Sequence, residues 1–262
     1  MLLNIADLTI TSLETISAFD VVTGAYKFAI DELQSATIAQ SQDETEITGK
    51  QGRRLATLKR NKSVTISGTN GLISGGLLEL QTGASFKNGA TNVMWTDYLT
   101  VTDNKATTTY KAIGTTGAEI KALYIKENGV ATKELAQAAT TADGKFAYAP
   151  ATKALTFTGI TDGTEIVVFY ERKITADSLE NVSDAYSTKA ALYVDALAED
   201  RCANVYRVQI YIPKADFNGE FSLEMGDSQT VHEFEATALA GACGGSATLW
   251  TYTVFGANAV DE

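Results

Sequence analysis

The sequence predicts a mainly β fold: an antiparallel β-sandwich or open barrel with one short helix and an inserted small β subdomain. Three observations support this prediction. The C-terminal part carries several runs in which apolar and polar side chains alternate, which is the period of a half-buried strand. Clusters of Gly, Asn, Asp and Ser separate these runs, as in antiparallel sheets. Only one stretch, Gly71 to Thr82, has an apolar spacing that suits a helix.

The C-terminal stretch from Ala203 to Phe255 carries the clearest strand signals. Four runs alternate in this way, and they are Tyr206–Pro213, Gly219–Met225, Thr230–Leu239 and Thr248–Phe255. Turn-forming residues lie between them, for example Asn218-Gly219 and Gly226-Asp227. We therefore expect these runs to pair as neighbours in an antiparallel sheet.

The N-terminal part is less clearly patterned. Residues 1–20 are mildly apolar and acidic, and they fit either a short strand or an arm that packs on a neighbouring subunit. Strand signals follow at Val21-Val22 and at Tyr26–Ile30, and they continue from Leu33 to Ala39. These segments are rich in β-branched and aromatic residues, which pack well on a pleated surface.

The segment from Ser41 to Ser67 is the most strongly polarised part of the chain. Its first half carries acidic residues, and its second half carries six of the 21 basic residues within 13 positions. The stretch from Thr48 to Gly52 between the two halves is typical of a turn. We therefore expect a long hairpin whose acidic and basic arms face each other, because cross-strand pairs of opposite charge are modestly stabilising.

The helix candidate spans Gly71 to Thr82. Leucine and isoleucine residues recur along it at a spacing compatible with one amphipathic helix. We expect the helix to end near Gly83, since glycine commonly follows the last helical residue. Gly75-Gly76 lies inside this stretch and lowers its helical propensity.

The character of the sequence changes between about Tyr98 and Lys173, where the apolar runs become short and threonine becomes frequent. Asn128-Gly129 and Asp162-Gly163 lie between β-type runs, and both dipeptides are good hairpin signals. We therefore predict a small β subdomain at residues 98–173. It is inserted into a β core whose two parts are residues 1–97, with the long hairpin and the short helix, and residues 174–262.

The charge of the protein limits its partners. The chain has 262 residues, with 21 basic and 32 acidic side chains, a net charge of −11 and a pI near 4.7. General binding to duplex DNA is not expected, because neutralising phosphates requires concentrated positive charge. A high negative charge instead favours solubility and repels other polyanions.

Targeting signals are not evident in the sequence. No run of about 18 apolar residues is present, so no membrane insertion is expected. The first residues lack the basic and apolar regions of a signal peptide, so we expect a protein that is made and used without export. For such a chain, Cys202 and Cys243 are expected to be free and mostly buried, although two neighbouring strands would be able to bring them together.

The sequence offers little catalytic or metal-binding chemistry. Its single histidine, His232, shares a predicted apolar strand face with Phe234 and Ala236, so we expect a structural histidine. No Cys-x-x-Cys pair and no phosphate-binding loop occurs. Glu233 and Glu235 suit a solvated or inter-subunit strand face better than a glycosidase site. We therefore predict no enzyme, no catalytic or metal-binding residues, and no cofactor.

The basic cluster of the hairpin is the main candidate for function. Its simplest interpretation is a solvated hairpin arm. Alternatively, it docks on acidic side chains of a neighbouring copy, because complementary patches on one chain are what a head-to-tail ring interface requires. Direct contact with nucleic acid is less favoured, since the aromatic residues of a single-strand groove are missing here. The candidate interface residues are Lys50, Arg53, Arg54, Lys59, Arg60, Lys62, Glu220, Glu224, Glu233 and Glu235.

Two regions carry a resemblance to a known family. The first is the polar hairpin leading into a short helix, Glu46–Arg54 through Ser63–Ile73, and the second is the closing strand series from Tyr206 to Phe255. With these regions the chain resembles the tail tube (major tail) proteins of tailed bacteriophages. The segments Ala154–Phe157 and Gly163–Tyr170 are similar to β insertions that are common in phage structural proteins.

The resemblance implies a virion structural protein that assembles in the host cytoplasm into the phage tail. It implies self-assembly into stacked rings, hexameric in this family, together with other tail proteins. DNA would pass through the hollow tube without specific binding, and an acidic lumen would keep it from sticking. On this basis the hairpin lines the channel or bridges successive rings, and the middle insertion decorates the tube.

Two other classes of function fit the same β pattern. One is a different phage structural protein, such as a capsid decoration, head–tail connector or baseplate protein. The other is a carbohydrate- or receptor-binding β module, in which aromatic side chains would provide stacking platforms for sugars. The aromatic candidates are Trp95, Tyr98, Trp250 and Tyr252, although their alternation on strands favours core packing.

Overall fold

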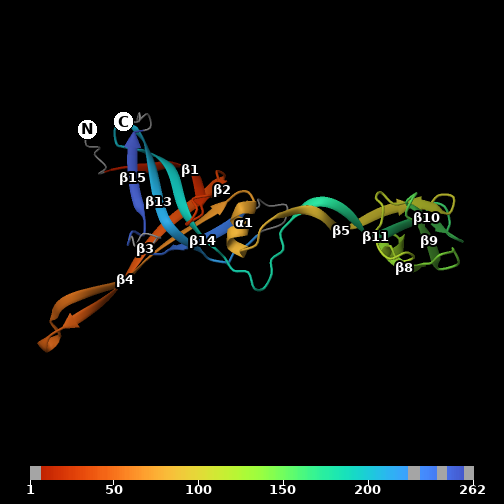
Figure 1. Ribbon diagram of the computed structural model, residues 1–262, viewed down its shortest axis with the longest axis horizontal. Helices are drawn as coiled ribbons and strands as arrows, with labels where there is room; N and C mark the ends of the chain where they lie inside the picture. Colours follow the sequence, from red (N-terminus) through yellow and green to blue (C-terminus); the bar gives the residue numbers. More distant parts are fainter. Residues whose placement is uncertain (1–6, 224–230, 241–246, 257–262) are drawn as a thin grey trace. The chain divides into compact units, whose positions relative to one another are not determined.

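The computed structural model describes residues 7–223, 231–240 and 247–256. Within these residues the chain forms fifteen strands, one α-helix and one short 3-10 helix (Figure 1). The predicted mainly β class with a single helix is therefore confirmed. The chain divides into two compact units, and the first combines residues 1–86 with residues 179–262. The second unit is the intervening segment, residues 87–178.

The first unit is built on an eight-stranded antiparallel sheet of order β2-β1-β12-β13-β14-β4-β3, in which β15 also pairs with β13. Its strands are β1 (Thr9–Phe19), β2 (Tyr26–Ile30), β3 (Leu33–Thr48), β4 (Arg54–Asn70), β12 (Lys189–Glu199), β13 (Val205–Phe217), β14 (His232–Ala238) and β15 (Thr251–Gly256). Buried and more exposed residues alternate along β14 and along most of β12. One face of the sheet is therefore apolar and has to be covered.

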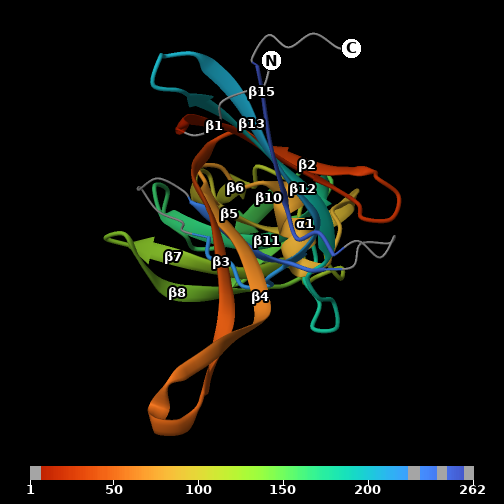
Figure 2. The same cartoon turned by 90° about the vertical axis from the view of Figure 1, so that its left-hand side faces the viewer.

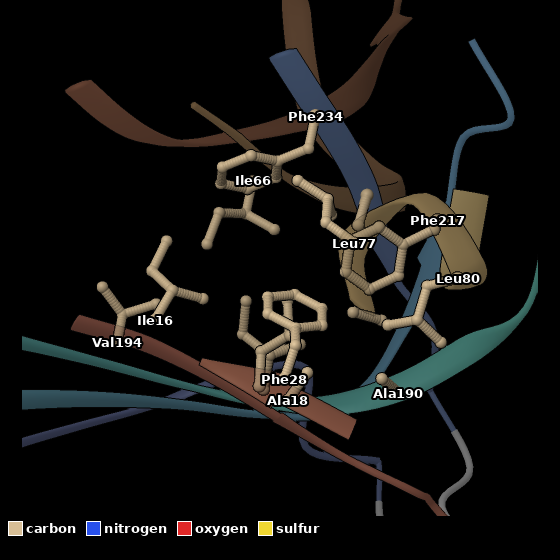
Figure 3. Packing of buried hydrophobic residues seen from close by; sticks show 14 of the residues in the cluster. Ile16, Ala18, Phe28, Ile66, Leu77, Leu80, Ala190, Val194, Phe217 and Phe234 are labelled. Carbon is tan, nitrogen blue, oxygen red and sulfur yellow. The ribbon is translucent and has the colours of Figure 1, made fainter. Parts of the chain in front are cut away.

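The apolar face folds around a core that helix α1 (Gly75–Thr82) closes on one side. Figure 3 shows Ile66 and Phe234 facing Ile16 and Val194 across this core, with Leu77 entering from the helix. Leu77 and Leu80 of α1 are almost completely buried. Burial of such a leucine stabilises the fold by roughly 1.5–3 kcal/mol, so α1 is held mainly by tertiary packing.

Helix α1 begins four residues later than the sequence predicts. Ser74 has extended backbone angles, and its hydroxyl accepts a hydrogen bond from the N–H of Leu77 at 3.4 Å, which makes it the N-cap. Residues 71–73 before it form a loop, and the amide of Asn70, the last residue of β4, donates to the Leu72 carbonyl at 2.6 Å. The predicted end is confirmed. Gly83 follows the helix in the left-handed region and donates its N–H to the carbonyl of Glu79.

Three other local predictions have clear outcomes. Residues 9–19 form strand β1, which settles the choice between a strand and an arm. The strand predicted at Val21-Val22 is wrong, because these residues lie in a turn where the Asp20 carboxylate accepts the N–H groups of Val22 and Thr23. The run Gly219–Met225 forms no continuous strand in its described part, where Leu223 makes a single bridge to His232. Its last two residues lie outside the described residues.

The second unit contains a seven-stranded sheet of order β5-β11-β7-β8-β9-β10-β6 around a separate apolar core. Its strands are β5 (Lys87–Thr100), β6 (Lys105–Thr107), β7 (Ile120–Glu127), β8 (Val130–Gln137), β9 (Lys145–Ala149), β10 (Ala154–Phe157) and β11 (Glu165–Ser178). Asn128-Gly129 joins β7 to β8 with both residues in the left-handed region, so this hairpin prediction is confirmed. The β8–β9 pair is parallel.

The first and last residues of the second unit are direct neighbours. Strands β5 and β11 pair without a bulge over their whole length, from Lys87 opposite Ser178 to Thr100 opposite Glu165. Cα atoms of opposite residues in an antiparallel pair lie only about 4.5–5.5 Å apart. A short connection between residues 86 and 179 is therefore geometrically possible.

We expect that replacing residues 87–178 by a short Gly-Ser linker leaves a folded first unit, because the two cores are separate and the cut ends are close. Circular dichroism and chemical denaturation of the deletion variant should show one cooperative transition. A product without cooperative unfolding would show that the two units fold as one.

Gly83 is a second point at which the fold can be tested. Its φ is +71°, and a Cβ built there would lie 2.0 Å from the carbonyl oxygen of Tyr186. Gly24 has a similar φ of +68° but no atom within 4 Å of such a Cβ. Gly24→Ala should therefore lower the free energy of unfolding by only roughly 1–2 kcal/mol, the strain of a left-handed backbone. Gly83→Ala should lower it clearly more. Equal losses of unfolding free energy in the two variants would contradict the close backbone contact.

Candidate subunit interface

The distal part of the β3–β4 hairpin, residues 39–62, is here named the arm. Every residue of the arm except Gly49 is exposed. Figures 1 and 2 both show the hairpin extending beyond the other strands of its sheet. The turn is a short 3-10 segment, Lys50–Gly52, in which Gln51 and Gly52 adopt positive φ. A two-stranded ribbon with both faces in water has little packing to stabilise it, which makes the arm a candidate surface for contact with a partner.

The acidic and basic strands of the arm face each other as predicted. Glu44 lies opposite Lys59 in the ladder, and their charged atoms are 3.4 Å apart. Glu46 forms an ion pair with Arg54. The Asn61 amide donates to the Asp43 carboxylate at 2.9 Å. Each exposed ion pair stabilises by only about 0–1 kcal/mol, but together these contacts engage all three acidic side chains of the arm.

A surplus of positive charge therefore remains on the arm. Between residues 43 and 62 there are six basic and three acidic side chains, a net charge of +3 in a chain of −11. Four of these basic residues make no ion pair with any part of the chain that the structure describes. They are Lys50, Arg53, Arg60 and Lys62.

The arm also exposes apolar side chains that the sequence analysis did not select. Ile47 and Leu58 are 47% and 37% exposed, and Leu55 near the turn is 68% exposed. The register places Ile47 opposite Ala56, and Thr45 opposite Leu58. Since paired residues share a face, Ile47, Ala56 and Leu58 lie opposite the face with the Glu44–Lys59 pair. The large apolar residues among charged neighbours, Ile47, Leu55 and Leu58, were the signal that would have identified them.

A second surface, here named the acidic groove, lies on the outer face of β3, β4 and β14. Its volume is about 430 Å³. Two rows of paired residues cross it: Glu233, Thr69 and Ser35 in one, and Glu235, Ser67 and Thr37 in the other. Hydroxyl and carboxylate oxygens therefore line the groove, and these acceptors suit guanidinium and ammonium groups, which only donate hydrogen bonds.

The structure brings three of the predicted acidic residues together. Glu220 lines the acidic groove with Glu233 and Glu235, and all three are exposed. Glu224 lies outside the described residues. Neither Arg53 nor Arg60 of the arm makes an ion pair with this groove within the described ranges, so the charges of both surfaces are open to another molecule.

The comparison with known families gives a match over nearly the whole chain. Residues 8–252 match the model of the YomU/Tube protein family. The chain belongs to this family. Among curated proteins, no match was found. Family membership and the β-rich fold agree with the resemblance noted from the sequence, and they identify a structural protein of the phage tail tube type.

A tube-family protein is expected to be a tail component that assembles with itself and with other tail proteins. A structural family of this kind also argues against an enzyme. No helix among the described residues is long and apolar enough to cross a membrane. Over the same residues, no group of three or more His, Cys, Asp and Glu side chains is placed to hold a metal ion.

His232 lies on strand β14, which also carries two residues of the acidic groove, and its ring contacts helix α1 and its N-cap. It is completely buried, as expected for a structural histidine. Its Nδ1 accepts the N–H of Ser74 at 3.2 Å, and its Nε2 lies 2.8 Å from Oε1 of Gln81. Gln81 in turn donates to the carbonyl of Glu233 at 2.9 Å. These contacts require a neutral ring with its proton on Nε2, and they fix the strand that carries Glu233 and Glu235 onto helix α1.

The expectation of buried cysteines is wrong for Cys202. This residue is exposed in the turn between β12 and β13, where the Asp200 carboxylate accepts its N–H at 2.8 Å. Turns of this kind run over the surface because their backbone groups need water or short-range side-chain partners. Cys243 lies outside the described residues.

Burial lowers the pKa of His232 from its ordinary value of 6.5. As the pH is lowered below about 6.5, the His232 imidazole therefore binds a proton in the unfolded chain before it does so in the folded chain. The unfolding free energy should then fall as the pH falls through this range. The measurement is chemical denaturation between pH 8 and pH 5, compared with His232→Gln.

The His232→Gln variant should lose this slope, whatever its absolute stability. The Asp20 and Asp97 carboxyl groups have pKa values lowered from their ordinary value of 3.8. They change the unfolding free energy only near and below that pH, so they do not contribute to the slope between pH 8 and pH 5. An identical slope in both proteins would assign the effect to other groups.

Proposed function

We propose that this protein self-assembles into hexameric rings that stack to form the phage tail tube, with DNA passing through the hollow centre. Membership of the YomU/Tube family and the mainly β fold support the tube assignment. Partners are other copies of the chain and further tail proteins, and the site of action is the virion tail after assembly in the host cytoplasm. Neither an enzymatic reaction nor membrane insertion forms part of the proposal.

The observation that carries the proposal is the separation of charge within one chain. The arm has a surplus of exposed basic groups, whereas the acidic groove combines Glu220, Glu233 and Glu235 with several hydroxyl groups. Two different complementary patches generate a head-to-tail contact, and such contacts form closed rings or open helical stacks. We infer that the arm of one copy docks in the acidic groove of the next.

Apolar side chains on the arm would strengthen this contact. Ile47 and Leu58 are exposed on one face of the arm. Their removal from water on docking would contribute about 25 cal/mol per Å² of apolar surface, in addition to the charge pairing. The charges supply orientation and partner choice, because like charges at the wrong register are repelled.

The negative charge of the rest of the chain suits a DNA conduit. With the arm at +3 and the whole chain at −11, the remaining residues are more acidic than the chain as a whole. Docking would engage the basic groups of the arm and leave an acidic assembly, which repels passing DNA and prevents adhesion. The inserted unit, residues 87–178, has its own core and is proposed to be an accessory decoration of the tube.

Charge reversal tests the interface. Arg53→Glu with Arg60→Glu should abolish polymerisation and leave the monomer fold intact, because neither side chain has an ion-pair partner within the described part of the chain. Negative-stain electron microscopy and sedimentation across concentration and salt give the readout, and ring averages give the subunit number. A matched control reverses Lys111 and Lys173, two exposed basic residues of the inserted unit.

A compensating change makes the test specific to the proposed pair of surfaces. Adding Glu233→Arg and Glu235→Arg to the reversed arm should restore rings or tubes, since the signs of both patches are then exchanged. Normal tubes from the reversed arm alone would reject the interface. Loss of tubes in the control variant to the same extent would indicate a nonspecific effect of net charge.

A further inference from the structure

Two surface hollows of the inserted unit meet at one ion pair. The larger, of about 710 Å³, lies among the β7–β8 turn, the β10–β11 loop and the residues before β9. The smaller, of about 140 Å³, lies beside Tyr98 on β5. Lys126 and Glu165 line both hollows, and their charged atoms are 3.8 Å apart. We refer to the combined hollow as the Tyr98 groove.

One end of the Tyr98 groove is an aromatic platform. Tyr98, Val167 and Tyr124 lie directly opposite one another on β5, β11 and β7, so they share one face of the sheet. Tyr98 is 71% exposed, although tyrosine rings usually bury their apolar faces. The ammonium group of Lys126 lies 4.9 Å from the centre of the Tyr98 ring, which helps to fix the ring in place.

The other end of the groove is polar. Asn128, Lys133 and Asp143 line it, and their side chains make no hydrogen bond or ion pair with the described part of the protein. An amide, an ammonium and a carboxylate thus line the same hollow as the Lys126–Glu165 pair, with donors and acceptors free for a ligand. Lysine and acidic groups are mixed here, so no single sign of charge dominates the groove.

We propose that the Tyr98 groove binds an oligosaccharide. A pyranose ring has an apolar face of C–H groups, which stacks on an exposed aromatic ring, and a rim of hydroxyl groups, which needs both donors and acceptors. The groove offers these two features side by side. The larger of its two hollows, at about 710 Å³, lies in the volume range of small-ligand sites, about 300–1,000 Å³. The mixed charge disfavours nucleic acid, whose phosphates need concentrated positive charge.

This binding activity is independent of tube formation, because the arm and the acidic groove belong to the other unit. A tail protein with such a site would make reversible contacts with glycans at a cell surface. Failure of one proposal therefore leaves the other standing, since ring assembly and sugar binding are measured separately.

Saturation-transfer difference NMR on the full chain tests the proposal. The probes are maltohexaose, cellohexaose, chitohexaose and a galacturonic acid hexamer, each at millimolar concentration. We expect saturable transfer to the ring C–H protons of at least one probe. Absence of transfer from all four sugars would overturn the assignment.

A matched pair of variants locates the site. Tyr98→Ala should weaken binding by up to about tenfold, the factor that corresponds to the upper range of aromatic stacking energies. Tyr186→Ala is the control, because Tyr186 is 78% exposed and belongs to the other unit. Equal affinities of the two variants would overturn the proposed site.

A second variant examines the polar end of the groove. Asp143→Ala removes a carboxylate acceptor that makes no ion pair within the described residues, so the fold should be unaffected. We expect weaker binding with the stacking contact to the sugar ring retained. Unchanged affinity in both Tyr98→Ala and Asp143→Ala would reject the groove as the binding site.

Discussion

The packing of helix α1 against the half-open sheet is the interaction on which the first unit depends. The sheet has one apolar face, and Leu77 and Leu80 of α1 cover the part of it that neighbouring strands leave open (Figure 3). The same helix carries Gln81 and follows Ser74, the two hydrogen-bonding partners of His232. Packing and buried polar contacts thus fix β14 and β4 together. The acidic groove lies on the outer face of these two strands, and the arm is an extension of one of them.

This arrangement separates rigid and exposed parts of the proposed interface. The acidic groove is supported from behind by a buried core, so its carboxylates are held at fixed positions. The arm has no such support and presents both of its faces to solvent. An exposed ribbon with unpaired cations and apolar side chains gains more free energy from a partner than a packed strand would. The reason is that contacts within its own subunit do not offset the cost of ordering the ribbon or bury its apolar side chains. Assembly of a tube from identical subunits is a natural use of such a pair of surfaces.

In the inserted unit, the sequence predicted a local turn but not the Tyr98 groove. Asn128-Gly129 identified a hairpin from two residues, since left-handed backbone angles are intrinsic preferences of these residue types. The Tyr98 groove was not predictable in the same way. Tyr98 was weighed as a stacking platform, but Lys126, Glu165 and Asp143 come from separate strands and loops that only the folded sheet brings together. The same holds for the acidic groove, where Ser35 and Glu233 are joined by strand order.

The sequence by itself determined the β class, the helix end at Gly83, the charged hairpin and the burial of His232. Each depends on local periodicity or on the backbone preference of one residue, so residues close together in the sequence are enough to determine it. The tertiary structure decided the start of α1, the turn at Val21-Val22, the exposure of Cys202 and the gathering of Glu220 with Glu233 and Glu235. These features depend on which strands become neighbours and on competing side-chain hydrogen bonds. Both are long-range outcomes of burying one apolar face, and a pattern of residue types along the chain does not specify them.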